Sequence, residues 1–253
     1  MTITFLGTGT SQGVPVIACD CEVCQSVDFR DKRTRSSVHI KTDQVSLVID
    51  TGPDFRSQIL RERINWVDAI LFTHQHKDHT AGMDDVRSFN FHQKMDMPVY
   101  GRKEVIEQLR KEFSYVFEDS QYPGVPRVKT YELDGKPFNI KGQEIIPIEV
   151  LHHKLPVHGF RIGDFTYITD ANKIPDKEIL KIKGSKIVVI NALQRKDHIS
   201  HFTLSEAIEV AKEIGADETY FTHISHNLGK HRDVLAELPE NIFLSYDGLQ
   251  LTI

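Results

Sequence analysis

The stretch AILFTHQHKDHTAG, residues 69–82, constrains the fold more than any other part of the sequence. Its apolar start is typical of a buried β-strand, which we expect to end at Thr73. An HxHxDH pattern follows at once, and its side chains are His74, His76, Asp78 and His79. Alternate residues of an extended chain project to the same side, so the first two histidines can share one cation while the last two side chains face a second. Imidazole and carboxylate together suit zinc, manganese or iron, so the sequence predicts a metal-binding loop at a strand end.

Further ligands are expected where other strands end, because one loop cannot complete two coordination spheres. The stretch VLHHKLPVHG offers His152, His153 and His158 between two expected strands. FTYITD ends on Asp170, whose carboxylate could bridge both cations, and TYFTH ends on His223. Each of these residues alone is more often simply hydrogen-bonded. Their repeated position at separate strand ends predicts that they converge on one rim.

Short apolar runs alternate with turn signals along the chain. We expect strands at 3–7, 36–42, 45–50, 69–73, 97–101, 144–151, 158–163, 165–170, 186–191, 218–222 and 242–253, and helices at about 54–63, 102–113, 176–183, 203–215 and 231–239. The fourth helix carries the clearest signals, because Thr203 can cap its start together with Glu206, and Gly215 can end it. Strands come in pairs first and then alternate with helices, which predicts a mixed sheet, or two sheets, with outer helices.

The composition of the chain limits which cellular compartment and which binding partners we expect. The formal net charge of −5 argues against binding to long nucleic acid, although a metal ion could still attract a small anionic substrate. The N-terminal stretch has no basic region followed by an apolar run, and no segment reaches the roughly 18 apolar residues that a membrane span needs. We therefore expect a cytoplasmic protein with no membrane association, in which thiols stay reduced. A homodimer is compatible with the sequence.

All three cysteines of the chain, Cys19, Cys21 and Cys24, lie in the stretch IACDCEVCQ. Three thiols so close together could form one disulfide with a spare thiol, a redox centre, or three ligands of a metal whose fourth ligand lies elsewhere. The expected reducing compartment argues against a structural disulfide.

The order HxHxDH, His, Asp, His resembles the metallo-β-lactamase superfamily, and VIDTGPDF resembles its first motif, whose aspartate, here Asp50, supports the ligand loop. The resemblance implies an α+β fold, an αββα sandwich of two mixed β-sheets flanked by helices, with a dinuclear metal site on the edge between the sheets. It covers nearly the whole chain, so we expect a single domain over residues 1–253. Within that domain we expect a cysteine-rich loop at about 17–27 and an insertion at about 111–136 that could form a lid.

The resemblance also implies a ligand set. Site one would hold His74, His76, His153 and Asp170, and site two would hold Asp78, His79, Asp170 and His223. His153 is preferred to His152 because HKLPVHG keeps the spacing from ligand to glycine of the most similar subgroup. His152 is the obvious competitor.

Two features indicate a branch of the superfamily. GTGTSQGVPVIACDCEVC is similar to the start of PhnP-like phosphodiesterases and, more loosely, of the PqqB proteins of quinone-cofactor synthesis. In the PhnP pattern the three cysteines bind a structural zinc with a histidine three residues after the last active-site ligand, here His226, and Cys3His is a common tetrahedral zinc set. That branch also places a histidine just before the helix at 203–215. His201 fits this place, with His198 as the alternative.

The resemblance implies hydrolysis of phosphodiesters, with small cyclic or nucleotide-type diesters as substrates. Hydroxide held by two divalent metal ions, Mn²⁺ or Zn²⁺, would attack phosphorus. Asp78 and Asp170 would orient it, and His201 would act as general acid. One alternative is a tRNase Z-like enzyme that processes tRNA 3′ ends, although the long protruding arm of those enzymes is not found here. Another is a PqqB-like biosynthetic or binding protein without robust hydrolase activity.

Overall fold

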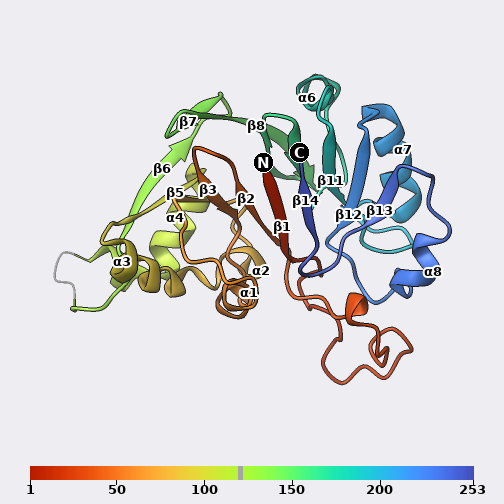
Figure 1. The fold of residues 1–253 in the computed structure, drawn as a ribbon, viewed down its shortest axis with the longest axis horizontal. Helices are drawn as coiled ribbons and strands as arrows, with labels where there is room; N and C mark the ends of the chain where they lie inside the picture. The colour runs from red at the N-terminus through yellow and green to blue at the C-terminus, as the bar shows by residue number, and fades with distance from the viewer. Residues whose placement is uncertain (119–121) are drawn as a thin grey trace.

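The computed structural model describes residues 1–118 and 122–253. Two seven-stranded β-sheets pack face to face, and helices lie outside both of them (Figure 1). The expected αββα sandwich is thereby confirmed. Within the described residues, no helix is both long and apolar enough to cross a membrane.

The first sheet joins the two ends of the chain, because the last strand pairs with the first one. Its strand order is β14 (Gln250–Thr252), β1 (Thr2–Gly7), β2 (Ser37–Lys41), β3 (Ser46–Ile49), β4 (Ala69–Leu71), β5 (Met97–Arg102) and β6 (Val128–Leu133).

The second sheet is built from the later part of the chain. Its strand order is β13 (Ile242–Leu244), β12 (Glu218–Thr222), β11 (Ile187–Asn191), β10 (Phe165–Tyr167), β9 (Leu155–Ile162), β8 (Gln143–His152) and β7 (Phe138–Ile140).

Helices of the first half of the chain cover the first sheet, and helices of the second half cover the second sheet (Figure 1). The α-helices are α1 (Phe55–Arg61), α2 (Lys77–Thr80), α3 (Arg87–Gln93), α4 (Lys103–Glu112), α5 (Ser114–Phe117), α6 (Asp176–Ile182), α7 (Leu204–Ile214) and α8 (His231–Leu235). Short 3-10 helices lie at Phe29–Asp31 and Met83–Val86.

The alternation of side chains along each strand builds three apolar layers. On β3, Leu47 and Ile49 belong to the core between the sheets, whereas Val48 belongs to the layer under α1, α3 and α4. On β11, Val189 faces the core between the sheets, and Val188 faces the layer under α6 and α7. Both faces of these strands are buried, which explains why they read as continuous apolar runs.

Most expected elements are present, and the capping of α7 is confirmed. The Thr203 hydroxyl accepts a hydrogen bond from the Glu206 amide, the Glu206 side chain reaches back to the Thr203 amide, and Gly215 ends the helix at a φ of +68°. The expectation of one strand at 242–253 is wrong, because the chain turns at 245–249 and places β13 and β14 in different sheets.

The expected insertion at 111–136 is partly regular structure. Among its described residues, β6 pairs in parallel with β5 and forms the edge of the first sheet. Residues 119–121 lie outside the described part of the chain. A role of this segment as a lid stays a prediction.

Parallel strands bring distant parts of the sequence to one edge. β3 and β4 are parallel in the first sheet, and β10, β11 and β12 are parallel in the second. Polar side chains follow the carboxyl ends of four of these strands: Asp50 after β3, the HxHxDH loop after β4, Asp170 after β10 and His223 after β12. Carboxyl ends of parallel strands lie on the same side of a sheet, so the topology collects these residues.

Candidate metal centre

A buried carboxylate, Asp50, anchors the HxHxDH loop. Its Oδ1 accepts a hydrogen bond from the Thr73 amide at 2.8 Å, and its Oδ2 accepts from the Thr73 hydroxyl at 2.8 Å. The Nδ1 of His79 lies 2.7 Å from the same Oδ2. Asp50 is fully buried, and burial raises the pKa of its carboxyl despite the opposing effect of His79.

This hydrogen bonding fixes the tautomers of two histidines. Thr73 gives its single hydroxyl hydrogen to Asp50, so Nδ1–H of His74 must donate to Thr73 Oγ1, 2.9 Å away. The Nε2 of His74 is then a lone pair that faces Nδ1 of His76 at 3.0 Å. In the same way, Nδ1–H of His79 donates to Asp50, so Nε2 is the nitrogen of His79 that can bind a cation.

The free nitrogen of His79 faces two carboxylates. Its Nε2 lies 3.2 Å from Oδ2 of Asp78 and 3.2 Å from Oδ2 of Asp170, and it has no hydrogen-bond partner among the described residues. Two carboxylates around one buried ring nitrogen require a positive charge between them, either a second proton on His79 or a bound cation. A divalent cation supplies that charge, so the donor set fits a metal ion.

The electrostatics of the cluster support the same interpretation. Burial lowers the pKa of His79, but the charges of Asp78, Asp170 and Asp50 outweigh it and raise that pKa well above its usual range. Burial opposes ionisation of Asp170, yet the neighbouring His223 and His79 lower its pKa well below the usual range. These groups are arranged to hold positive charge among ionised carboxylates.

Four donor atoms converge on one of the two predicted metal positions. The donor atoms of Asp78, His79, Asp170 and His223 all lie within 4.8 Å of one another. Asp50, Asp170 and His223 each follow a strand with a left-handed φ, between +54° and +65°. Such strain in non-glycine residues concentrates at functional sites, and here it turns three side chains toward a common point.

At the other predicted position, the structure places His152, and not the preferred His153, beside the first two histidines of the loop. The His152 ring centroid lies 5.1 Å from that of His76 and 5.7 Å from that of His74. His153 lies in the exposed turn between β8 and β9 at a φ of +56°, and its amide donates to the Asn172 side chain. His152 is the last residue of β8 and faces the cluster. His153 comes next and points away, because successive residues of an extended chain project to opposite sides.

His201 lies beside the cluster, and His198 does not. The Nδ1 of His201 lies 3.8 Å from Oδ1 of Asp170, and the ring stacks on His223 with a centroid distance of 4.9 Å. The side chain is buried, and Nδ1 has no hydrogen-bond partner in the described part of the chain. His198 is exposed. Burial lowers the pKa of His201 to about 3, so its imidazole is uncharged at neutral pH.

His158 does not join the centre. Its amide donates to the Thr73 carbonyl, so β9 runs close to the start of the metal loop. Its side chain is buried, and neither ring nitrogen has a hydrogen-bond partner among the described residues. Burial lowers its pKa to about 4, which keeps the ring uncharged.

Sequence reasoning did not find two residues that orient the ligands. Thr73 orients His74, and the hydroxyl of Ser36 lies 3.2 Å from Nδ1 of His223. The place of Thr73 next to the first histidine offered a signal. Ser36 offered none, because it directly precedes β2 and only long-range packing brings it beside His223.

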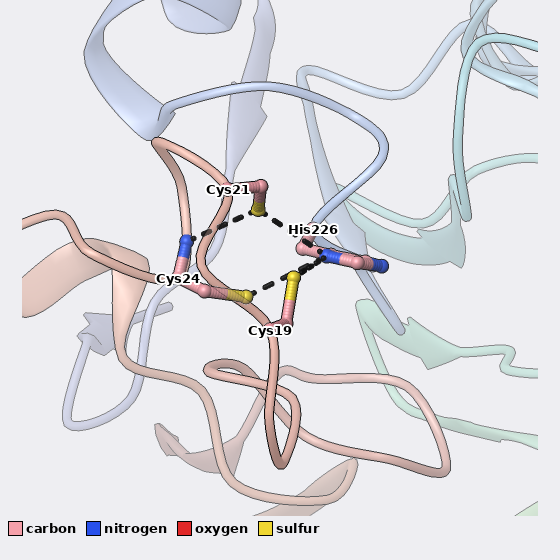
Figure 2. A group of neighbouring side chains, drawn as sticks. All are labelled: Cys19, Cys21, Cys24 and His226. Carbon is pink, nitrogen blue, oxygen red and sulfur yellow. Dashed lines mark hydrogen bonds between the residues drawn. The ribbon is translucent and has the colours of Figure 1, made fainter.

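The three cysteines converge on His226. Figure 2 shows their sulfur atoms pointing toward one ring nitrogen, and the Sγ atoms of Cys19, Cys21 and Cys24 lie 3.3, 3.4 and 3.5 Å from Nδ1 of His226. A tetrahedral zinc with Zn–S near about 2.3 Å and Zn–N near about 2.0 Å would hold sulfur and nitrogen about 3.6 Å apart. The group therefore has the spacing of a Cys3His zinc set, and all three cysteines are free of disulfides.

The thiols differ in their surroundings. Hydrogen bonding from the Cys24 amide lowers the pKa of Cys21 to about 6, so this sulfur is largely a thiolate at neutral pH. Burial raises the pKa of Cys24 to about 11, because its sulfur packs with Val14 and Val23. Bound zinc would favour the thiolate form of all three, which its positive charge stabilises.

Comparison with known proteins identifies the family. A family model described as β-lactamase superfamily domain matches residues 46–224. The chain belongs to the metallo-β-lactamase superfamily. A crystal structure described as a new diphosphatase from the PhnP family superposes with a TM-score of 0.93 at 40% sequence identity, over 99% of this chain and 96% of that one. This chain is thus a PhnP-like member of the superfamily.

Two curated relatives extend this result. An octanoyltransferase of Porphyromonas gingivalis (strain ATCC BAA-308 / W83) is 40% identical over 100% of this chain, which spans only 52% of that protein's length. A probable metallo-hydrolase, YhfI of Bacillus subtilis (strain 168), is 27% identical over 76% of this chain and 80% of its own. The family and the likenesses to the diphosphatase and to the probable metallo-hydrolase support a hydrolase.

The positions of His152 and His153 lead to a prediction about metal binding. His152→Ala should lose about one active-site metal ion per chain, because it removes an imidazole from the group that faces His74 and His76. His153→Ala is the matched control and should keep the full metal content, since its side chain is exposed. Metal analysis of both purified variants by mass spectrometry decides between them. Loss of metal in His153→Ala alone would restore the original preference.

The cysteine cluster generates another prediction. Cys21→Ser should lose one zinc per chain and lower the melting temperature, because the cluster ties the N-terminal loop to the chain segment after β12. Asp20→Ala, at the exposed neighbour of this cysteine, should change neither quantity. A Cys21→Ser protein with unchanged zinc content and unchanged melting temperature would refute the assignment.

Proposed function

We propose that this chain is a metal-dependent phosphodiesterase that hydrolyses small cyclic or nucleotide-type diesters. The observation that carries the proposal is the position of His201. Nδ1 of this buried imidazole lies 3.8 Å from Oδ1 of Asp170 and has no hydrogen-bond partner among the described residues. A proton donor beside the predicted metal ligands is what cleavage of a bond to a poor leaving oxygen requires.

Each polar group has a separate task in this proposal. Two divalent ions, Mn²⁺ or Zn²⁺, would polarise the phosphoryl oxygens and lower the pKa of bound water. Asp78 and Asp170 would accept hydrogen bonds from the attacking water and so orient it toward phosphorus. His201 would donate a proton to the leaving oxygen. Its imidazole is uncharged before substrate binds, and the negative charge of the diester would raise its pKa and favour the protonated form.

A diphosphate is the second candidate substrate. It is favoured by the structure that is 40% identical and is described as a diphosphatase. Attack at phosphorus would be the same in both cases, but the leaving group would be a phosphate instead of an alkoxide. A phosphate leaves without a proton far more readily, so His201 would contribute less to the rate.

Other interpretations have weaker support. Processing of tRNA would require a surface that attracts a polyanion, whereas the chain carries a formal net charge of −5. A PqqB-like binding role would not require both groups of metal-binding side chains to remain oriented by Asp50 and Thr73.

A cytoplasmic location belongs to the same proposal. A reducing cytoplasm would suit the three thiols of the cysteine cluster.

Chelation tests the proposal as a whole. The metal-free protein should not hydrolyse bis-p-nitrophenyl phosphate, and adding Mn²⁺ or Zn²⁺ should restore turnover, because the carboxylates and histidines alone cannot offset the charge of the phosphate. Release of p-nitrophenolate measures the rate. Undiminished turnover by the fully metal-free protein would contradict the proposal.

The leaving group tests the role of His201. His201→Ala should reduce hydrolysis of a cyclic nucleotide by about 10²- to 10⁴-fold, the usual contribution of a general acid. It should reduce hydrolysis of bis-p-nitrophenyl phosphate far less, because p-nitrophenolate leaves without a proton. His92→Ala, at an exposed histidine of α3, is the control and should affect neither substrate. Equal losses for both substrates in His201→Ala would show that His201 does not act as the acid.

A further inference from the structure

A second polar cleft lies at the opposite end of the first sheet. It has a volume of about 550 Å³ and is lined by outward-facing side chains of β1, β2 and β3 and by the loop between α1 and β4. Ser46 at the start of β3 belongs to this cleft, whereas Asp50, which supports the metal loop, follows the end of β3. Four residues of extended strand separate them by about 13 Å, so the cleft is separate from the metal centre.

A chain of hydrogen bonds directs a free acceptor atom of a largely buried side chain into the cleft. The hydroxyl of Ser46 donates to the Trp66 carbonyl at 2.7 Å, so it can only accept from Nε2–H of His39, also 2.7 Å away. Nδ1 of His39 is then a lone pair with no hydrogen-bond partner among the described residues. The side chain is only 7% exposed, and burial lowers its pKa to about 4. A ligand with a hydrogen-bond donor would satisfy this nitrogen.

An aromatic ring is held rigidly in the wall of the same cleft. Trp66 is 43% exposed, and its Nε1–H donates to Oδ1 of Asp68 at 2.8 Å. Lys141 donates to the same oxygen at 2.6 Å, and the Ser46 amide donates to the other oxygen. The indole orientation is therefore fixed before any ligand binds, which lowers the entropic cost of stacking against it.

Two cations in the cleft have no ion-pair partner within the described part of the chain. They are Lys41 and Arg63, and Arg63 holds a left-handed φ of +54° at the end of α1, a conformation that disfavours side chains larger than glycine. Of the three carboxylates in the lining, Glu62 pairs with Arg61 and Asp68 pairs with Lys141. Asp43 remains without a partner there, so the unpaired groups of the lining are two cations and one carboxylate.

We propose that this cleft binds a purine mononucleotide, with its base stacked on Trp66 and its phosphate between Lys41 and Arg63. The exocyclic amine of the base would donate to Nδ1 of His39. A planar heterocycle, an anion and a hydrogen-bond donor are the three features that the cleft requires together, and a purine mononucleotide carries all of them. This site is independent of the proposed hydrolysis at the metal centre.

Tryptophan fluorescence tests the proposal directly, because Trp66 is the only tryptophan of the chain. Titration of the intact protein with AMP, excited at a wavelength that adenine does not absorb, should give saturable quenching. Adenosine and inorganic phosphate should each bind at least about tenfold more weakly, because each offers only part of the contacts. Quenching by AMP that rises linearly without saturation would overturn the proposal.

Substitution of the two cations provides the second arm. The double variant Lys41→Ala/Arg63→Ala should weaken AMP binding by about tenfold or more, because it removes both phosphate contacts from exposed positions. Lys212→Ala removes an exposed cation of α7 and should leave the affinity unchanged. Equal affinities in the two proteins would overturn the proposal. Hydrolysis of bis-p-nitrophenyl phosphate should be unchanged in both variants, so failure of this site and failure of the proposed function are distinguishable.

Discussion

The metal centre depends on one buried carboxylate. Asp50 holds the start of the HxHxDH loop through Thr73 and holds its end through His79, so a single side chain sets the orientation of two predicted ligands. It can do so because β3 and β4 are parallel neighbours, which places the residue after β3 beside the loop after β4. A carboxylate buried this deeply is stable only while all of its hydrogen bonds are made. The sheet pairing and the ligand geometry therefore support each other.

Much of this arrangement could be predicted from the sequence, because its signals are local. The apolar run before His74 and the strand ends before Asp170 and His223 indicate where chain direction changes, and parallel pairing then gathers those ends. The cap residues of α7 predicted that helix for the same reason. The resemblance to the metallo-β-lactamase superfamily supplied the packing of two sheets between outer helices, which no local pattern contains.

Features that depend on long-range packing could not be predicted. The choice between His152 and His153 depends on which residue the β8–β9 turn directs inward, and neighbouring histidines have the same local chemistry. The run at 242–253 reads as one strand, and only the pairing of its two halves with different sheets divides it. α3 was not expected, because its sequence RSFNFHQ is poor in strong helix formers and is stabilised by burial of Phe89.

The cysteine cluster also has a consequence for biosynthesis. Cys19 and His226 are 207 positions apart, so a zinc ion bound by both would close a loop that contains most of the chain. The three thiols are synthesised at least 202 positions before the histidine. Complete coordination, and the rigidity that it gives, would thus come only after nearly all of the sandwich has been made.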